Sequence, residues 1–201
     1  MQLVVATRNQ DKLKEIRTLL KGLPVKVVSL EGFKGVPEVE EDRKTLEANA
    51  KKKALIVSAF LKKLVVADDS GLEIKALGGR PGVFSARFSG KGATYSSNNE
   101  KVLRLLKGMP LSKRKACFRC VIAVADKGKV IGTAEGRIKG IITKKPSGNT
   151  GFGYDPIFRP NGYKKTFAEL GINKKNRISH RSKALAKAGK IIERYVLTSR
   201  C

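Results

Sequence analysis

Residues 3–20 read LVVATRNQDKLKEIRTLL, and this stretch decides the fold class. It opens on four apolar residues, Leu3–Ala6, which favour a short strand. Apolar residues then recur every three or four positions, as on one face of a helix. They are Leu13, Ile16, Leu19 and Leu20. Gly22 and Pro24 end the helical pattern, so the chain begins as a strand followed by a helix.

The same alternation continues along the chain. Strands are expected at residues 25–30 and 63–69, with a helix from about Thr45 to Lys62 between them. A helix near Ser96–Lys107 precedes a run of strands over residues 115–143, in which DKGK forms a hairpin turn. A last helix covers residues 179–197, with Ser179 as its N-cap. This order of elements predicts an α/β fold with a mixed sheet.

The length and the composition are those of a soluble globular protein. The 201 residues suit a single domain over 1–201, which can contain two lobes, and they are enough for a real core. Apolar residues make up 41% and charged residues 30%, and no apolar stretch approaches the ~20 residues of a membrane span. The first residues, MQLVVATRNQDK, lack the pattern of a secretory signal, so we expect a cytoplasmic protein without membrane attachment.

Lysine and arginine are spread along the whole chain and give a net charge of +26. A polyanionic partner, either a nucleotide or nucleic acid, is therefore more plausible. A host whose proteins are generally basic would produce the same charge. Nonspecific attraction of nucleic acid is a further expectation.

Two of the three cysteines form a single CxxC, Cys117 and Cys120. Without a second pair or nearby histidines this is a weak zinc signal. The segment also has a strand pattern, in which residues three apart point to opposite faces. We therefore favour cysteines of the core, and expect the terminal Cys201 to be a free thiol.

Four places could carry chemistry, and the first is the turn between the first strand and the first helix. Its residues, 7–12, read TRNQDK. Such turns offer free backbone N–H groups and the positive end of a helix dipole, to which Thr7 and Asn9 can add side-chain donors. Lys12 stands in the first helical turn, where a cation is unfavourable unless an anion binds beside it. A capped helix with a solvated Lys12 is the alternative.

The second place is the helix near 45–62, where Lys53 falls inside the apolar stripe and Asn49 lies one turn before it. A lysine on an inward face either extends to solvent or meets an anion.

The third place is the pair Asp68 and Asp69, which follows an apolar strand. Consecutive strand residues face opposite ways, so the two carboxylates cannot share one site unless the strand has already ended. One of them, with a carboxylate from EVEED (38–42), could hold Mg²⁺.

The fourth place combines the glycine-rich loop 146–156 with the start of the last helix. Phe152 and Tyr154 offer ring faces for a base, and the glycines let the backbone approach a ligand. Arg181 lies on the apolar stripe of the last helix, and His180, the only histidine, is near its edge. An inward arginine needs a partner, which is either a ligand or a structural carboxylate.

Together these segments resemble the inosine/xanthosine triphosphate pyrophosphatase family (Ham1-like), whose members remove non-standard purine nucleotides. Six stretches match its signature segments in order and cover nearly the whole chain. They are ATRNQDKLKE (6–15), TLEANAKKKA (45–54), ADDSGLEIKALGGRPGVFSARFSG (67–90), GNTGFGYDPIF (148–158), TFAEL (166–170) and ISHRSKAL (178–185).

The resemblance implies two lobes around a long mixed sheet with flanking helices, and an active site in the groove between the lobes. It implies a homodimer that uses Mg²⁺ to hydrolyse ITP, dITP or XTP to the monophosphate and pyrophosphate, by water attack at the α-phosphorus. The implied catalytic base is Asp69, and the implied metal carboxylates are Glu41 and Asp69. The other implied site residues bind substrate: Thr7, Arg8, Asn9, Gln10, Asp11, Lys12, Lys53 and Ser70 near the phosphates, and Phe152, Gly153, Tyr154, Asp155, Lys175, His180 and Arg181 around the base.

The chain departs from the family pattern at two points. Asp42–Arg43 stands where the family often has a glycine, so Glu40 is an alternative to Glu41. Lys174 stands where an acidic residue is common, although Lys175 still matches. Action on standard or damaged pyrimidine nucleotides and a basic nucleic-acid-binding protein remain alternative functions.

Overall fold

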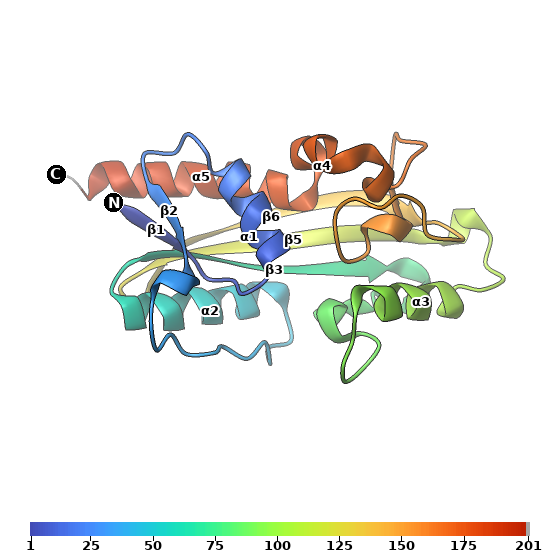
Figure 1. Cartoon of the computed structure of the whole chain (residues 1–201), viewed down its shortest axis with the longest axis horizontal. Coiled ribbons are helices and arrows are strands. Elements are labelled where there is room, and N and C mark those ends of the chain that lie inside the picture. Colours follow the sequence, from blue (N-terminus) through green and yellow to red (C-terminus); the bar gives the residue numbers. More distant parts are fainter. Residues whose placement is uncertain (200–201) are drawn as a thin grey trace. The chain divides into compact units, whose positions relative to one another are not determined.

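The computed structural model describes residues 1–199 and shows an α/β protein with a mixed sheet and flanking helices (Figure 1). The predicted fold class is therefore confirmed. The strands are β1 (Gln2–Val5), β2 (Lys26–Ser29), β3 (Leu64–Ile74), β4 (Pro81–Gly82), β5 (Lys115–Asp126), β6 (Lys129–Ile142) and β7 (Phe158–Pro160). The helices are α1 (Gln10–Leu19), α2 (Leu46–Leu61), α3 (Tyr95–Leu105), α4 (Phe167–Ile178) and α5 (His180–Thr198).

The strands hydrogen-bond in the order β2-β1-β3-β5-β6-β7, with β4 beside β3. β1 is parallel to β2 and β3, whereas β4 and β7 are antiparallel to their neighbours. The chain divides into two compact units, which are described separately. Unit 1 contains residues 1–69, 120–136 and those from 181 onward, and unit 2 contains residues 70–119 and 137–180. The assignment of 1–201 to one domain stays a prediction.

Unit 1 is built around the parallel pairing of β1 with β3, in which Leu3 lies opposite Leu64 and Val5 opposite Val66. The apolar faces of α1 and α5 cover these strands, as their helical spacing predicts. The buried residues of this core include Leu3, Val5, Leu13, Ile16, Leu20, Leu64, Val66, Leu185, Ala188, Ile192 and Val196. Asn9 caps α1 and Thr45 caps α2 through side-chain oxygens that accept from backbone N–H groups.

Unit 2 has its own core, in which Phe118, Phe158 and Phe167 pack ring against ring. Capping boxes begin α3 at Thr94 and α4 at Thr166. α4 and β7 were not expected from the sequence. α4 is interrupted at Gly171, whose φ of 78° is not helical, so its apolar pattern is broken after four residues.

The third strand does not end at Asp69, contrary to the sequence-based expectation. β3 continues to Ile74, because Leu72 and Glu73 pair with β4 and Leu72 N donates to Ser85 Oγ at 2.9 Å. The last helix begins at His180, so Ser179 stands at the predicted N-cap position. Ser179 also closes α4, where its N–H donates to Lys175 O at 2.9 Å.

The DKGK hairpin is confirmed, with positive φ at Lys127 and Gly128 between β5 and β6. Both cysteines of the CxxC lie on β5. Cys120 is buried in the core of unit 1, and Cys117 is half-buried. Cys201 lies outside the described residues. Over residues 1–199, no helix combines the length and apolar character that a membrane crossing needs.

Candidate functional site

The two aspartates of β3 are both buried in unit 1. Asp68 Oδ2 lies 3.3 Å from Lys12 Nζ and 3.5 Å from Arg181 Nη2. Burial alone would raise the pKa of Asp68, but the charges of Lys12 and Arg181, with that of Lys53, outweigh it and hold the pKa below its usual value. Asp68 is therefore an anion fixed among cations.

Asp69 has different surroundings. Its Oδ2 accepts a hydrogen bond from Asn49 Nδ2 at 3.0 Å, and the residue is only 3% exposed. Burial, and then the nearby charge of Glu41, raise the pKa of Asp69 to about 6. A carboxylate whose pKa lies near neutrality is suited to accept a proton from a reacting group.

Lys53 connects the acidic segment before α2 with β3. Its Nζ donates to the main-chain oxygen of Asp68 at 2.6 Å and forms an ion pair with Glu41. The predicted inward lysine therefore meets an anion within the protein. Glu40 is exposed, and its main-chain carbonyl accepts from Lys52 Nζ at 3.0 Å. This geometry favours Glu41 over Glu40 as the carboxylate beside Asp69.

Glu41 and Asp69 form the carboxylate pair that could hold a divalent cation. Among residues 1–199, no group of three or more His, Cys, Asp or Glu side chains has the arrangement of a metal site. Mg²⁺ does not require one, since it is commonly bound by one or two carboxylates together with substrate phosphates and water. Burial raises the pKa of Asp69 most, and the repulsion from Glu41, which raises it further, is what a cation would relieve. The donor set therefore fits Mg²⁺.

The turn before α1 is held by its own side chains. Thr7 Oγ1 accepts from the N–H of Asn9 at 3.2 Å, and Asn9 Oδ1 accepts from the N–H of Lys12 at 3.0 Å. Arg8 and Gln10 instead contact the segment after β2, at Val36 O and Glu31 Oε1. A hollow of about 310 Å³ is lined by Arg8, Leu30, Glu31, Phe33, Gly35 and Val36.

Lys12 extends from this turn to Asp68. Burial alone would lower the pKa of Lys12, but the Asp68 carboxylate outweighs it and the pKa is raised. Lys12 is therefore a charged ammonium group held on the first turn of α1. The side chain of Asp11 is half-buried in the same turn.

Arg181 is the deepest cation of unit 1. Its guanidinium forms ion pairs with Glu15 of α1 and with Asp68, and both the Arg181 and Glu15 side chains are 2% exposed. These two carboxylates raise the pKa of Arg181 against the effect of burial. Sequence reasoning missed Glu15, although Glu15 lies one turn before Leu19 at the edge of the apolar stripe.

The glycine-rich loop of unit 2 is organised around Asp155. Asp155 Oδ2 accepts from the N–H of Phe152 at 2.9 Å and from Lys175 Nζ at 2.5 Å. Lys175 Nζ also lies 4.3 Å from the centre of the Phe152 ring. Gly151 is required here, because a Cβ on it would lie 2.2 Å from Asp155 Oδ2, and its φ is +77°.

Helix α3 supports the same loop. Asn99 Nδ2 donates to Gly153 O at 3.0 Å, and the Tyr95 ring lies 5.9 Å from the Phe152 ring. Tyr154 is buried, and its hydroxyl donates to Ser85 O at 2.8 Å. Phe152 is therefore the more exposed of the two rings that were expected to offer a face to a base.

His180 is also buried in unit 2. Its ring stacks on that of Phe118, with centroids 4.6 Å apart and an interplanar angle of 6°. Ser70, the first residue of unit 2, continues β3 directly after Asp69 and is half-buried.

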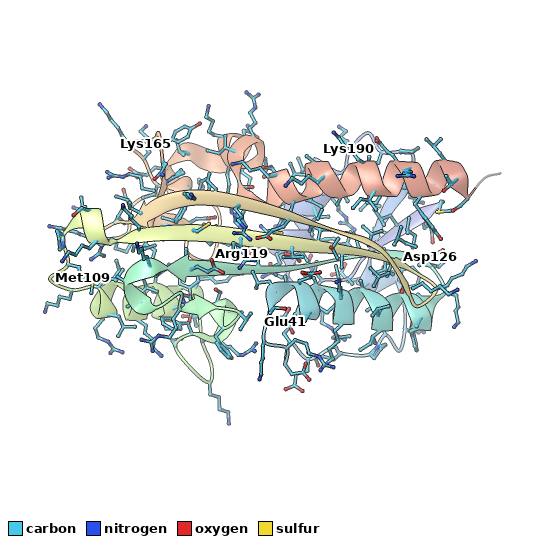
Figure 2. The ribbon with its side chains drawn as sticks, turned by 180° about the vertical axis from the view of Figure 1, so that it is seen from behind. Glu41, Met109, Arg119, Asp126, Lys165 and Lys190 are labelled. Atoms are coloured by element: carbon cyan, nitrogen blue, oxygen red, sulfur yellow. The ribbon has the colours of Figure 1, made fainter. Side chains whose placement is uncertain are left out.

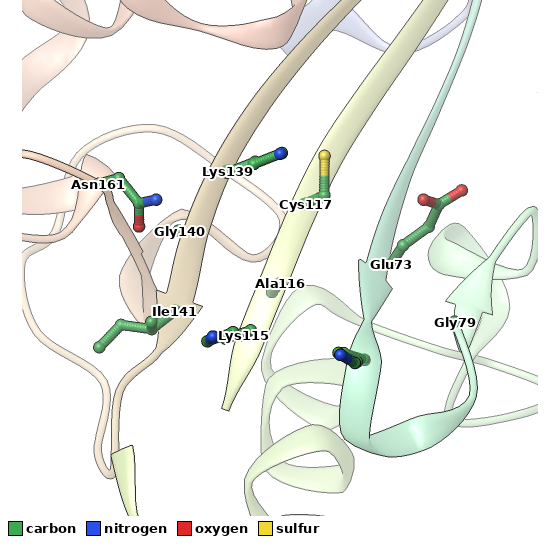
Figure 3. Close-up of a pocket in the computed structure, with 10 residues that line it drawn as sticks. Glu73, Gly79, Lys115, Ala116, Cys117, Lys139, Gly140, Ile141 and Asn161 are labelled. Carbon is green, nitrogen blue, oxygen red and sulfur yellow. The ribbon is translucent and has the colours of Figure 1, made fainter. Parts of the chain in front are cut away.

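A separate hollow of about 570 Å³ lies over the strands of unit 2 (Figure 3). Alternate residues of β5 and β6 rise from the sheet there, so that Lys139 and Cys117 lie side by side. Lys75 and Lys115 complete a basic lining. Arg119, labelled in Figure 2, lies two residues after Cys117 on the same face of β5 and pairs with Glu73 at 2.7 Å.

Comparisons with known proteins agree on one family. The family model described as "Ham1 family" matches residues 3–191. A dITP/XTP pyrophosphatase of Desulforamulus reducens is 53% identical over 194 residues, which are 96% of each chain, and one of Bacillus subtilis is 46% identical over 94% of this chain and 96% of its own.

Solved structures agree with this result. A HAM1 protein from Coxiella burnetii superposes with a TM-score of 0.87 at 39% identity, covering 96% of this chain and 98% of its own. A dITP/XTP pyrophosphatase from Mycobacterium abscessus gives 0.76 at 40% identity, over 94% and 98% of the two chains. The protein belongs to the Ham1 family.

Proposed function

We propose that the protein hydrolyses non-standard purine nucleoside triphosphates (ITP, dITP and XTP) to the monophosphate and pyrophosphate. The observation that carries the proposal is the buried Asp69, whose pKa is raised to about 6, beside the carboxylate of Glu41. The ammonium groups of Lys12 and Lys53 supply the positive charge that phosphate oxygens need. Relatives named dITP/XTP pyrophosphatase, at 43–53% identity over nearly the whole chain, support the same activity. The protein is a nucleoside-triphosphate pyrophosphatase.

Asp69 is the proposed general base. It takes a proton from the water that attacks the α-phosphorus. Glu41 and Asp69 would hold Mg²⁺, which supplies neutralisation of phosphate charge when bound. Asn49 keeps the Asp69 carboxylate oriented through its hydrogen bond.

Lys12 and Lys53 are the proposed ligands of the phosphates. Both are partly accessible, with side-chain exposures of 17% and 13%, and both are held by carboxylates. Binding of the triphosphate would give each ammonium group a second anion without moving it far. Thr7, Arg8, Asn9, Gln10, Asp11 and Ser70 are the remaining proposed residues of this part of the site.

The proposed base-binding residues are Phe152, Gly153, Tyr154, Asp155, Lys175, His180 and Arg181. A 6-oxo group suits donors such as His180 and backbone N–H groups. Adenine presents an amino donor at the same position. This amino group would face the N–H donors of the protein without a hydrogen bond, which costs about 1–3 kcal/mol of binding free energy per buried group. Arg181 already has two carboxylate partners, so its part in base binding rests on the family resemblance.

Two further features are proposed from the family resemblance alone. The protein works as a homodimer, and it acts on the nucleotide pool of the cytoplasm. Size-exclusion chromatography with light scattering tests the first, and imaging of a tagged chain in its host tests the second.

A substrate panel tests the activity. The protein is incubated with Mg²⁺ and with ITP, XTP, GTP, ATP, UTP and dITP, and both pyrophosphate and orthophosphate are measured. We expect pyrophosphate from ITP, dITP and XTP at rates well above those for GTP and ATP. Release of orthophosphate, or equal rates on all purine nucleotides, would refute the proposal. Preference for UTP would favour action on pyrimidine nucleotides.

The basic hollow over β5 and β6 favours nonspecific nucleic-acid binding as a second candidate function. Lys75, Lys115 and Lys139 line this hollow together with one carboxylate, Glu73, and the chain carries +26 overall. Such binding is electrostatic and weakens steeply with added salt. Binding of a random oligonucleotide at 0.15 M salt, compared between the wild type and a triple glutamine variant of these lysines, distinguishes a real site from diffuse attraction.

A further inference from the structure

Asn99 is a buried polar residue with one half of its side chain unused. It lies on α3, is 7% exposed, and donates through Nδ2 to Gly153 O at 3.0 Å. Its Oδ1 is buried and has no hydrogen-bond partner among the described residues. A buried acceptor left in this state costs free energy, so it is a candidate partner for a donor that arrives with a ligand.

The unused oxygen lies beside the loop that carries the proposed base platform. Because Nδ2 donates to the carbonyl of Gly153, the amide group of Asn99 lies against the backbone that follows Phe152. One turn before Asn99 on α3, Tyr95 packs its ring 5.9 Å from that of Phe152. The acceptor and the aromatic platform therefore belong to one part of unit 2.

The chemistry of the base says which donor can fill this position. Hypoxanthine has a single N–H donor, on N1, and xanthine has the same N1–H. Adenine has no hydrogen on N1, so its lone pair would face the lone pairs of Oδ1. A buried acceptor at this edge would accept the 6-oxo purines and reject adenine. Guanine also carries N1–H, so this contact does not exclude it.

We propose that Asn99 is a specificity-determining residue whose Oδ1 accepts a hydrogen bond from N1–H of the substrate base. The inference rests on the purine triphosphate activity proposed above and deepens it. It assigns discrimination against adenine to an acceptor on α3, in addition to the donors that face the 6-oxo group.

The test compares ITP, 1-methyl-ITP and ATP with the wild type and with Asn99→Leu, which has a similar size and no polar atom. For the wild type, we expect kcat/KM for ITP to exceed that for 1-methyl-ITP roughly 10- to 100-fold. In Asn99→Leu, kcat/KM for ITP falls by a similar factor. Methylation of N1 then changes kcat/KM less than about threefold, and the ratio of ITP to ATP falls.

A second variant separates the acceptor from the loop contact. Asn99→Asp keeps the acceptor oxygen and loses the donor to Gly153, so we expect it to keep the preference for ITP over 1-methyl-ITP. Asn176→Leu is the matched control, because Asn176 Oδ1 on α4 also lacks a partner among the described residues. This control should leave the ITP to 1-methyl-ITP ratio unchanged.

Three results would overturn the inference. The first is a wild type that hydrolyses 1-methyl-ITP as fast as ITP. This measurement uses only the wild-type protein, so it does not depend on the folding of a variant. The second is an Asn99→Leu variant that keeps the wild-type ratio of kcat/KM for ITP to that for 1-methyl-ITP. The third is an Asn99→Asp variant that loses this ratio. A wild type that releases no pyrophosphate from ITP would instead refute the proposed function itself.

Discussion

Asp68 and Asp69 are consecutive residues of β3 whose carboxylates make different close contacts. Asp68 Oδ2 lies 3.3 Å from Lys12 Nζ, whereas Asp69 Oδ2 accepts from Asn49 Nδ2 at 3.0 Å. Strand alternation produces this separation, because β3 runs unbroken through both residues. Cations keep the carboxylate of Asp68 ionised, whereas burial and the charge of Glu41 raise the pKa of Asp69 to about 6.

Replacing Asp69 by asparagine should nearly abolish turnover. Asparagine keeps the size of the side chain and can still accept from Asn49, but it cannot take a proton from water. We expect kcat for pyrophosphate release from ITP to fall roughly 10²- to 10⁴-fold. Glu38→Gln, an exposed change in the same unit, is the control. Substantial residual activity in a folded Asp69→Asn protein would assign the base to another residue.

The same variant should be more stable than the wild type at neutral pH when divalent cations are absent. The pKa of Asp69 is raised from 3.8 to about 6 in the folded protein, so the folded state retains a proton that the unfolded state has lost. The contribution of Asp69 to the free energy of unfolding therefore falls as pH rises from about 4 through 6. Two pH units correspond to about 3 kcal/mol as an upper value.

Urea unfolding in EDTA between pH 4.5 and 7.5 measures this effect. The stability difference between Asp69→Asn and the wild type should grow in favour of the variant up to about pH 6.5 and then level off. A difference that does not change with pH would mean that Asp69 has an ordinary pKa in the folded protein.

Much of the fold was predictable because its helices carry periodic apolar stripes. Lys53 could be singled out because it interrupts such a stripe, and it does meet Glu41. Asn99 interrupts one as well, since Val102 and Leu106 follow at helical spacing and are buried, but sequence analysis did not single it out.

The features that were missed depend on contacts distant in the chain. The second half of β3 contains Ser70 and Gly71, which disfavour strands, and is kept extended by its pairing with β4. Glu15 resembles a solvated helical residue until Arg181, 166 positions later, is seen to pair with it. Such pairings cannot be read from local spacing.

Removing Arg181 should destabilise the protein strongly. Arg181→Met leaves the buried carboxylates of Glu15 and Asp68 without their shared cation, which should cost about 3–5 kcal/mol. Glu15→Met should cost less, because Asp68 still neutralises Arg181. The double variant should cost less than the sum of the two single changes. Urea unfolding at pH 7.5 measures all three proteins, and strict additivity would contradict a buried pair.

Gly151→Ala should disturb the glycine-rich loop in two ways, through the left-handed φ of residue 151 and through a clash of the added methyl group with Asp155. A Cβ on Gly151 would lie 2.2 Å from Asp155 Oδ2 and displace the carboxylate that binds Lys175 and the N–H of Phe152. Gly162→Ala is the matched control, since Gly162 has a similar φ of +82° and no atom within 4 Å of an added Cβ. Both variants should lose about 1–2 kcal/mol of stability from the left-handed backbone. Only Gly151→Ala should also raise KM for ITP, because only its added methyl group moves Asp155. Equal KM values for the two variants would show that the Asp155 contacts do not contribute to substrate binding.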